Sequence, residues 1–99
     1  MTDTDLRPQE GNPCVVLRKR LRFRSWHRGT KEIDLLLGTF ADQWLEAFDE
    51  GKLRRYEGLL ANSDPDLYAW IVGDEAAPDD VDAELIRLLK KVKTRAVST

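Results

Sequence analysis

Metal-binding and disulfide-forming residues are scarce in this 99-residue sequence, which has one cysteine, Cys14, and one histidine, His27. A lone cysteine cannot form a disulfide within the chain, and two soft ligands are too few for a structural zinc site. A Cys14–His27 nucleophile pair would also need an orienting group and an oxyanion hole, and the sequence indicates neither. We therefore expect no metal site and no catalytic residues, so the protein should not be an enzyme.

Glycine-rich phosphate loops and long apolar runs are also missing. The glycines are dispersed along the chain, whereas P-loops and dinucleotide-binding motifs need them clustered. No apolar run approaches the roughly 18 residues of a membrane span, and residues 1–14 have neither a secretory apolar core nor an arginine-rich transit character. We therefore expect a soluble, bacterial-type cytoplasmic protein that neither cradles nucleotides nor binds membranes.

Acidic residues are absent from residues 18–31, which carry seven lysines and arginines, although the whole chain has a net charge of −2. From Glu32 to the end, 15 acidic residues outnumber eight basic ones, so the sequence reads as a basic arm on an acidic body. With Phe23 and Trp26 among them, the basic residues could contact phosphates while the rings stack on nucleobases. A nucleic-acid-binding module that uses residues 18–31 is therefore the alternative function, and the acidic remainder weighs against it. A membrane-surface helix would need a broad apolar face, which this segment lacks.

Apolar residues recur at three- and four-residue spacing in five segments, as in amphipathic helices, and no segment shows the alternation of a strand. The segments carry, in chain order, Val16, Leu17, Leu21 and Phe23; Ile33, Leu36, Leu37, Phe40, Trp44 and Phe48; Leu53, Tyr56, Leu59 and Leu60; Leu67, Trp70 and Ile71; and Val81, Leu85, Leu88, Leu89 and Val92. The first helix should end near His27. The sequence therefore predicts an all-α, small single-domain five-helix bundle over residues 14–94, between flexible tails at 1–13 and 95–99.

Polar residues and a glycine mark the ends of these helices. Gly29 suits a helix-ending position with positive φ, and Thr30 beside it is an N-cap candidate for the second helix. Asp49 and Asp64 are the N-cap candidates of the third and fourth helices, and Pro65 fits the first helical turn after Asp64. The connection between the first two helices is therefore expected to be a short turn.

The stretch of residues 24–34 stands out because it places basic residues, an aromatic residue and a glycine in one turn between helices. Arg28 offers a planar set of donors for carboxylates or carbonyls, Gly29 lets a partner's backbone approach, and Glu32 adds an acceptor. Trp26 is the kind of residue that anchors protein interfaces. The alternative interpretation is structural: an Arg28–Glu32 ion pair, a glycine that only ends a helix, and a tryptophan packed in the core.

Residues 28–32, Arg-Gly-Thr-Lys-Glu, match the R-G-x-x-E signature of the SdhE family of flavinylation factors, which the mitochondrial assembly factor of succinate dehydrogenase shares. The surrounding residues 22–41 are similar to the family as well, and so are residues 56–60 and 64–70. The resemblance runs from Lys19 to Val92. A short signature in this longer context identifies the chain as a member of that family.

The resemblance implies a compact five-helix assembly chaperone. It implies binding to the flavoprotein subunit of succinate dehydrogenase, and in some bacteria to that of fumarate reductase, and promotion of covalent FAD attachment to that subunit. FAD is then bound by the client, the chaperone has no cofactor of its own, and we expect a monomer. We expect the partner-binding residues to be Arg28, Gly29 and Glu32, with Arg24, Trp26, His27 and Asp34 in support.

Overall fold

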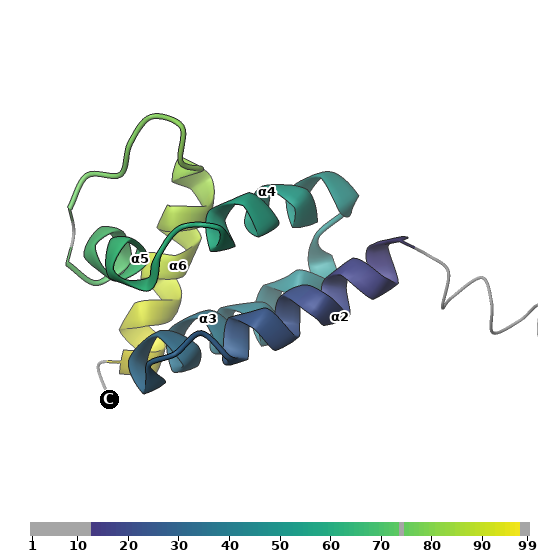
Figure 1. Cartoon of the computed structure of the whole chain (residues 1–99), viewed down its shortest axis with the longest axis horizontal. Coiled ribbons are helices and arrows are strands. Elements are labelled where there is room, and N and C mark those ends of the chain that lie inside the picture. Colours follow the sequence, from purple (N-terminus) through teal and green to yellow (C-terminus); the bar gives the residue numbers. More distant parts are fainter. Residues whose placement is uncertain (1–12, 74, 98–99) are drawn as a thin grey trace, which may run out of the picture.

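The computed structural model describes residues 13–73 and 75–97 of the chain (Figure 1). Within these residues the chain forms five α-helices, one short 3-10 helix and no β-strand, which confirms the predicted all-α fold. In chain order the elements are α2 (Pro13–Trp26), α3 (Lys31–Trp44), η1 (Leu45–Ala47), α4 (Glu50–Leu60), α5 (Asp64–Ile71) and α6 (Ala83–Val97). Helix α6 extends three residues past the domain end predicted at 94, and the tail predicted at 1–13 lies almost wholly outside the described residues.

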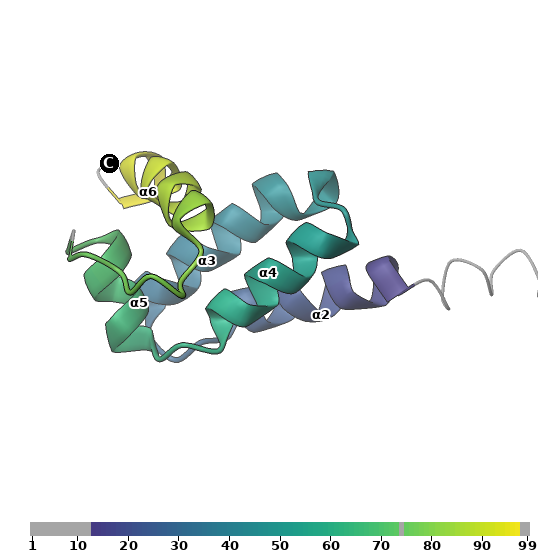
Figure 2. The ribbon, with the colours of Figure 1, turned by 90° about the horizontal axis from the view of Figure 1, so that it is seen from above.

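Helix α3 occupies the middle of the fold. It contacts both α2 and α6, while α4 packs against α2 and α5 packs against α6. Figures 1 and 2 show α2 and α3 side by side as an antiparallel pair, with α6 crossing α3 and α4 running along α2. Because α3 is covered from several sides, most of its apolar residues are buried and form the centre of the core.

Helix α2 buries only a narrow face. Leu17, Leu21 and Ser25, at four-residue spacing, are 2%, 0% and 0% exposed and point into the core. Val16 and Phe23, which the sequence pattern places on the apolar stripe, are 46% and 63% exposed. That part of the prediction is wrong because an α-helix turns by about 100° per residue, which carries positions 16 and 23 to the side away from the buried face.

Helix α3 ends earlier than its apolar pattern predicts. The pattern runs to Phe48, but α3 stops at Trp44, η1 follows, and Phe48 is buried with an extended backbone. Arg18 of α2 donates hydrogen bonds from Nε to the Leu45 carbonyl at 2.8 Å and from Nη2 to the Phe48 carbonyl at 3.1 Å. The Leu45 carbonyl also accepts from the Phe48 amide, so the two bonds of Arg18 add to that turn and tie the segment after α3 to α2.

The helix caps follow the sequence pattern with one exception. The side chains of Thr30 and Asp49 each accept a hydrogen bond from the backbone amide three residues ahead, as predicted for N-caps. The N-cap of α5 is Ser63 rather than Asp64, since the Ser63 hydroxyl accepts the hydrogen bond from the Asp66 amide. Asp64 is instead the first helical residue, so its carboxylate can bond elsewhere.

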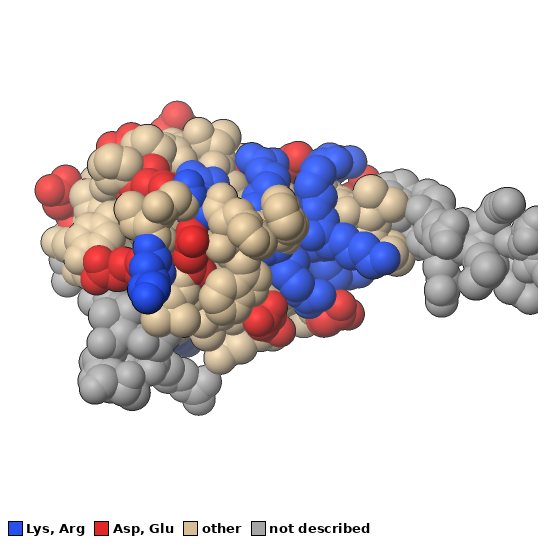
Figure 3. All heavy atoms as spheres, turned by 60° about the horizontal axis from the view of Figure 1, so that its bottom comes forward, with Lys and Arg blue, Asp and Glu red and all other residues tan. Residues whose placement is uncertain are grey.

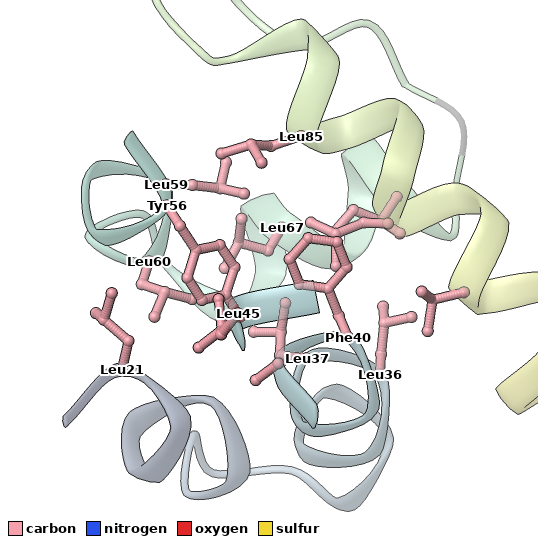
Figure 4. Close-up of a cluster of buried hydrophobic side chains, with 14 of the residues drawn as sticks. Leu21, Leu36, Leu37, Phe40, Leu45, Tyr56, Leu59, Leu60, Leu67 and Leu85 are labelled. Carbon is pink, nitrogen blue, oxygen red and sulfur yellow. The ribbon is translucent and has the colours of Figure 1, made fainter. Parts of the chain in front are cut away.

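One cluster of buried apolar side chains, drawn from all five helices, forms the core (Figure 4). The rings of Phe40 and Tyr56 lie at its centre with their centroids 5.3 Å apart, and leucines of the surrounding helices pack around them. Trp70 is buried, as its position in the apolar pattern indicates, whereas Trp44 is partly buried at the edge of the cluster. Because short helices are marginal on their own, this shared burial is the main source of their stability.

Ser25 and Tyr56 form a polar contact inside this apolar core. The Ser25 hydroxyl donates to the Leu21 carbonyl, 2.7 Å away, because a carbonyl can only accept. The Tyr56 hydroxyl, 2.6 Å from Ser25 Oγ, must then be the donor of the second bond. Burial raises the pKa of Tyr56, so the hydroxyl keeps the proton that this bond requires.

Replacing Ser25 with alanine is expected to destabilise the fold by about 2 kcal/mol, because the Tyr56 hydroxyl then stays buried without an acceptor. Adding Tyr56→Phe to this variant should recover much of the loss, since the unsatisfied donor is removed as well. Urea unfolding followed by circular dichroism measures the single and double variants. Strictly additive losses in the double variant would contradict the assigned bond.

Ion pairs join α4 to the start of α6. Arg55 lies 2.6 Å from Asp82 and 2.8 Å from Glu84, and Lys52 lies 3.1 Å from Glu84. Hydrogen bonds from Arg55 lower the pKa of both carboxyl groups, and Asp82 also caps α6 by accepting from the Leu85 amide. Because the pairs are partly exposed to solvent, they orient α6 more than they stabilise it.

Candidate partner-binding surface

Arg28, the first residue of the signature, is tied into the fold from the turn between α2 and α3. Its guanidinium donates from Nε to Asp64 Oδ1 at 2.8 Å, from Nη1 to the Leu60 carbonyl at 2.7 Å and from Nη2 to the Asn62 carbonyl at 2.8 Å. The Arg28 side chain is only 12% exposed. These three bonds, which we call the Arg28 clamp, hold the α2–α3 turn onto the end of α4 and the start of α5.

Asp34 and Gly29 shape the turn itself. Oδ1 of Asp34 accepts hydrogen bonds from the Arg28 amide at 2.6 Å and from the Gly29 amide at 3.2 Å, so its carboxylate fixes the backbone just before α3. Gly29 has a φ of +149°, which confirms the predicted positive φ and strains any residue with a side chain. A Cβ at this position would also lie 3.3 Å from Asp64 Oδ2. The turn therefore requires glycine for its backbone conformation.

Glu32 lies exposed on the first turn of α3 and faces α5. The Tyr68 hydroxyl donates a hydrogen bond to Glu32 Oε2 at 3.3 Å, and the charge of Glu32 raises the pKa of Tyr68. An open groove of about 360 Å³ lies between the two helices here. The groove, which we call the Glu32 groove, is lined by Thr30, Glu32, Ile33, Asp64, Pro65 and Tyr68.

Arg28 and Glu32 therefore lie in different environments. The structural interpretation of the sequence predicts an ion pair between Arg28 and Glu32. This pair is not formed, because Arg28 pairs with Asp64 and Glu32 bonds to Tyr68. The donors of Arg28 are used within the fold, whereas the carboxylate of Glu32 is open to solvent. Arg28 is thus a positioning residue of the turn, and the carboxylate of Glu32 is the accessible charged group of the signature.

The remaining predicted site residues lie on α2 and do not meet in the groove. The Trp26 ring lies against Gly38 of α3 and is half-buried, so it is neither a core residue nor a free anchor. His27 is exposed and stacks on Phe23 with the ring centroids 4.1 Å apart. Arg24 is half-buried, and its side chain makes no ion pair or hydrogen bond with the described residues. The predicted site thus divides into the turn, with its groove, and the outer side of α2.

Two of the five basic residues of α2, Arg20 and Arg22, form ion pairs, and a third, Arg18, bonds to backbone carbonyls. Figure 3 shows the side of the molecule that α2 and α3 form, where lysines and arginines gather in one area with acidic side chains beside it. Arg20 pairs with Glu57 at 3.0 Å, and Arg22 lies 3.3 Å from Asp42 and 3.7 Å from Glu46. The nucleic-acid-binding alternative is not supported, because four of the seven cations of residues 18–31, namely Arg18, Arg20, Arg22 and Arg28, already bond within the fold.

The sequence pattern misses Tyr68, Pro65 and Asp64 as parts of this surface. It marks Asp64 and Pro65 only as a helix start, and it contains nothing that places α5 beside α3. The available signal was the family resemblance, which includes residues 64–70 as well as the signature. These residues belong to the surface because the Arg28 clamp and the Glu32–Tyr68 bond bring α5 to the turn.

Cys14 and His27 lie near opposite ends of α2, about 20 Å apart at the rise of an α-helix, so they form no nucleophile pair. Within residues 13–73 and 75–97, no group of three His, Cys, Asp or Glu side chains is placed to hold a metal ion. Over the same two ranges, every helix is too short or too polar to cross a membrane.

The fold and the site define a small all-α domain with an exposed groove beside a rigid glycine turn. The chain belongs to the family described as flavinator of succinate dehydrogenase, whose model matches residues 19–93. It is 39% identical over 74 residues to succinate dehydrogenase assembly factor 2, mitochondrial, of Dictyostelium discoideum, which covers 75% of this chain and 52% of that protein. It is also 38% identical over 88 residues to succinate dehydrogenase assembly factor 2-A, mitochondrial, of Drosophila yakuba. That alignment covers 87% of this chain and 53% of the relative. The chain spans about half the length of these curated relatives.

These comparisons confirm the family that the signature indicates and correct the predicted compartment. The relatives are named as assembly factors rather than as enzymes. The prediction of a cytoplasmic protein is wrong by this comparison, because the relatives are named as mitochondrial. The prediction failed because it relied on the character of residues 1–14, and the helical fold itself encodes no compartment.

Proposed function

We propose that this protein binds the flavoprotein subunit of succinate dehydrogenase and promotes the covalent attachment of FAD to that subunit. Membership of the flavinator family and the assembly-factor names of the relatives support this proposal. The protein acts as a monomer without a cofactor of its own, and FAD belongs to the client. The flavoprotein subunit of fumarate reductase is a second client of the same kind.

The Glu32 groove, with Gly29 next to it in the turn, is the observation that carries the proposal. Gly29 presents no side chain, so a partner's backbone can approach the turn closely. Glu32 keeps carboxylate lone pairs beyond its bond to Tyr68, and Pro65 and Tyr68 add apolar surface beside it. The groove therefore combines polar acceptors, apolar contact area and a rigid backbone, which suits the binding of another protein.

The residues of this chain act by binding, and the chemistry of attachment lies with the client and its flavin. By binding one arrangement of the client more tightly than the others, the protein raises the population of that arrangement. Reacting groups that are held in the right geometry react faster without any group from the chaperone. A tenfold preference for the reactive arrangement requires only about 1.4 kcal/mol of differential binding.

Replacing Glu32 with glutamine is expected to weaken flavoprotein binding about tenfold, because the amide loses the charge and one acceptor oxygen. At limiting chaperone, the fraction of the subunit that carries covalent FAD should fall accordingly. Flavin fluorescence of the denatured flavoprotein on a gel measures the attachment. Circular dichroism should show an unchanged fold, since Glu32 is exposed.

The matched control is Glu75→Gln, which makes the same change at an exposed glutamate between α5 and α6. It should leave both binding and flavin attachment at the level of the unmodified protein. Gly29 is a poorer test site than the sequence indicates, because any side chain strains its φ of +149° and alters the turn together with the surface. Unchanged binding and attachment with Glu32→Gln would contradict a contact role of the groove.

A further inference from the structure

The outer side of α2 carries an uncovered apolar and aromatic stripe. Val16 is 46% exposed and Phe23 is 63% exposed, and His27 is exposed as well. With Arg20 between them, these positions follow the three- and four-residue spacing of one helix face. No described element of the fold packs over this stripe. Exposed apolar side chains that lie together on one helix face often mark an interaction surface, whereas a single exposed apolar side chain is common on any protein.

The stripe is flanked by cations without acidic partners. The side chains of Lys19 on one side and Arg24 on the other make no ion pair or hydrogen bond with the described residues, in contrast to Arg20, which pairs with Glu57. Figure 3 shows the basic side chains of this region gathered next to uncharged surface. The charges that remain unneutralised on the outer side of α2 are therefore positive.

His27 adds a directed polar group to the stripe. Its Nδ1 lies 2.7 Å from the Phe23 carbonyl, and because a carbonyl only accepts, Nδ1 is the donor of this bond. The ring also stacks on Phe23, so its orientation is held by two contacts. Within the part of the chain that the structure describes, no residue bonds to the other ring nitrogen, Nε2.

We propose that the outer side of α2, with Val16, Lys19, Phe23, Arg24 and His27, binds an acidic, amphipathic segment of the flavoprotein partner. Carboxylates of such a segment complement the two unpaired cations, and its apolar side chains cover the exposed ring of Phe23. Two unpaired cations are too few for strong phosphate binding, and two exposed apolar side chains are too few for insertion into a membrane. The identity of the partner rests on the proposed function, whereas the surface is separate from the Glu32 groove.

The test compares a double variant, Lys19→Glu with Phe23→Ser, with the matched control Lys91→Glu. Lys91 is an exposed lysine of α6 that makes no ion pair with the described residues. Biolayer interferometry against the purified flavoprotein subunit of succinate dehydrogenase should show binding weakened about 30-fold by the double variant and less than twofold by the control. The dependence of affinity on salt should also be shallower in the double variant, because an attractive charge contact is lost. Both changes are at exposed positions, and circular dichroism checks that the helices are kept.

The outcomes separate this inference from the proposed function. If the unmodified protein binds the flavoprotein and the double variant binds it equally well, the proposed role of the α2 surface is overturned and the proposed function stands. If the unmodified protein does not bind the flavoprotein, both are overturned together. The unmodified protein is also tested against single-stranded DNA and anionic phospholipid vesicles. If it binds either of them and the double variant does not, the surface serves another class of partner and the inference is overturned.

Discussion

Replacing Arg28 with alanine is expected to lower the free energy of unfolding by about 3 kcal/mol and the melting temperature by about 15 °C. The variant loses all three bonds of the Arg28 clamp, which leaves Asp64 without its cation and the carbonyls of Leu60 and Asn62 without these donors. Because the Arg28 side chain is only 12% exposed, water replaces these bonds only in part. Thermal and urea unfolding followed by circular dichroism measure the loss.

Arg24→Ala is the matched control, since it removes a half-buried arginine side chain that bonds to none of the described residues. Its free energy of unfolding should stay within about 0.5 kcal/mol of the unmodified protein. Equal stability of the Arg28 and Arg24 variants would show that the clamp does not hold the turn. The comparison also separates two kinds of functional loss: Arg28→Ala should lose binding together with stability, and Glu32→Gln should lose binding alone.

Replacing Gly38 with alanine is expected to destabilise the protein by about 2 to 4 kcal/mol, although a glycine-to-alanine change inside a helix usually stabilises it. Gly38 is buried in α3, and a Cβ at this position would overlap the ring of Trp26 from α2. The indole N–H of Trp26 donates to Asp42 Oδ1 at 3.3 Å, so displacing the ring also costs this bond. Urea unfolding measures the loss, and tryptophan fluorescence reports the displaced ring.

Two further variants decide whether the clash with Trp26 is the cause. In a Trp26→Ala background, Gly38→Ala should cost nothing or should stabilise the protein by up to about 1 kcal/mol, as helix propensity alone predicts. Gly58→Ala is the control in the unmodified protein, because a Cβ at Gly58 in α4 would meet no atom within 4 Å. It should be neutral or stabilising. A Gly38→Ala variant as stable as Gly58→Ala would contradict the close packing of α2 on α3.

The helices and most of their ends could be predicted from the sequence because these features depend on neighbouring residues. The N-caps Thr30 and Asp49 and the positive φ of Gly29 each follow from side chains within one turn of the chain. The errors arise where distant segments decide. Val16 and Phe23 are exposed because no helix among the described residues packs on that side of α2, and the sequence of one segment does not show which of its sides another helix covers.

The candidate site shows the same division. Its position in the turn could be predicted, because the signature is contiguous in sequence. The role of Arg28 could not, since the clamp joins it to Leu60, Asn62 and Asp64, more than thirty positions away. The Glu32 groove likewise depends on Tyr68, which only the packed fold brings to the signature. The contiguous motif therefore located the surface in the sequence. Which residues of other helices complete that surface could be seen only in the structure.

The Arg28 clamp has a consequence for the kinetics of association. It joins the turn to two other helices, and Asp34 fixes the turn from within α3, so the backbone beside the Glu32 groove is already ordered before a partner arrives. A preorganised surface loses little conformational entropy on binding, and its association rate is not limited by a slow rearrangement. Any folding or reshaping that accompanies complex formation should then take place on the side of the client.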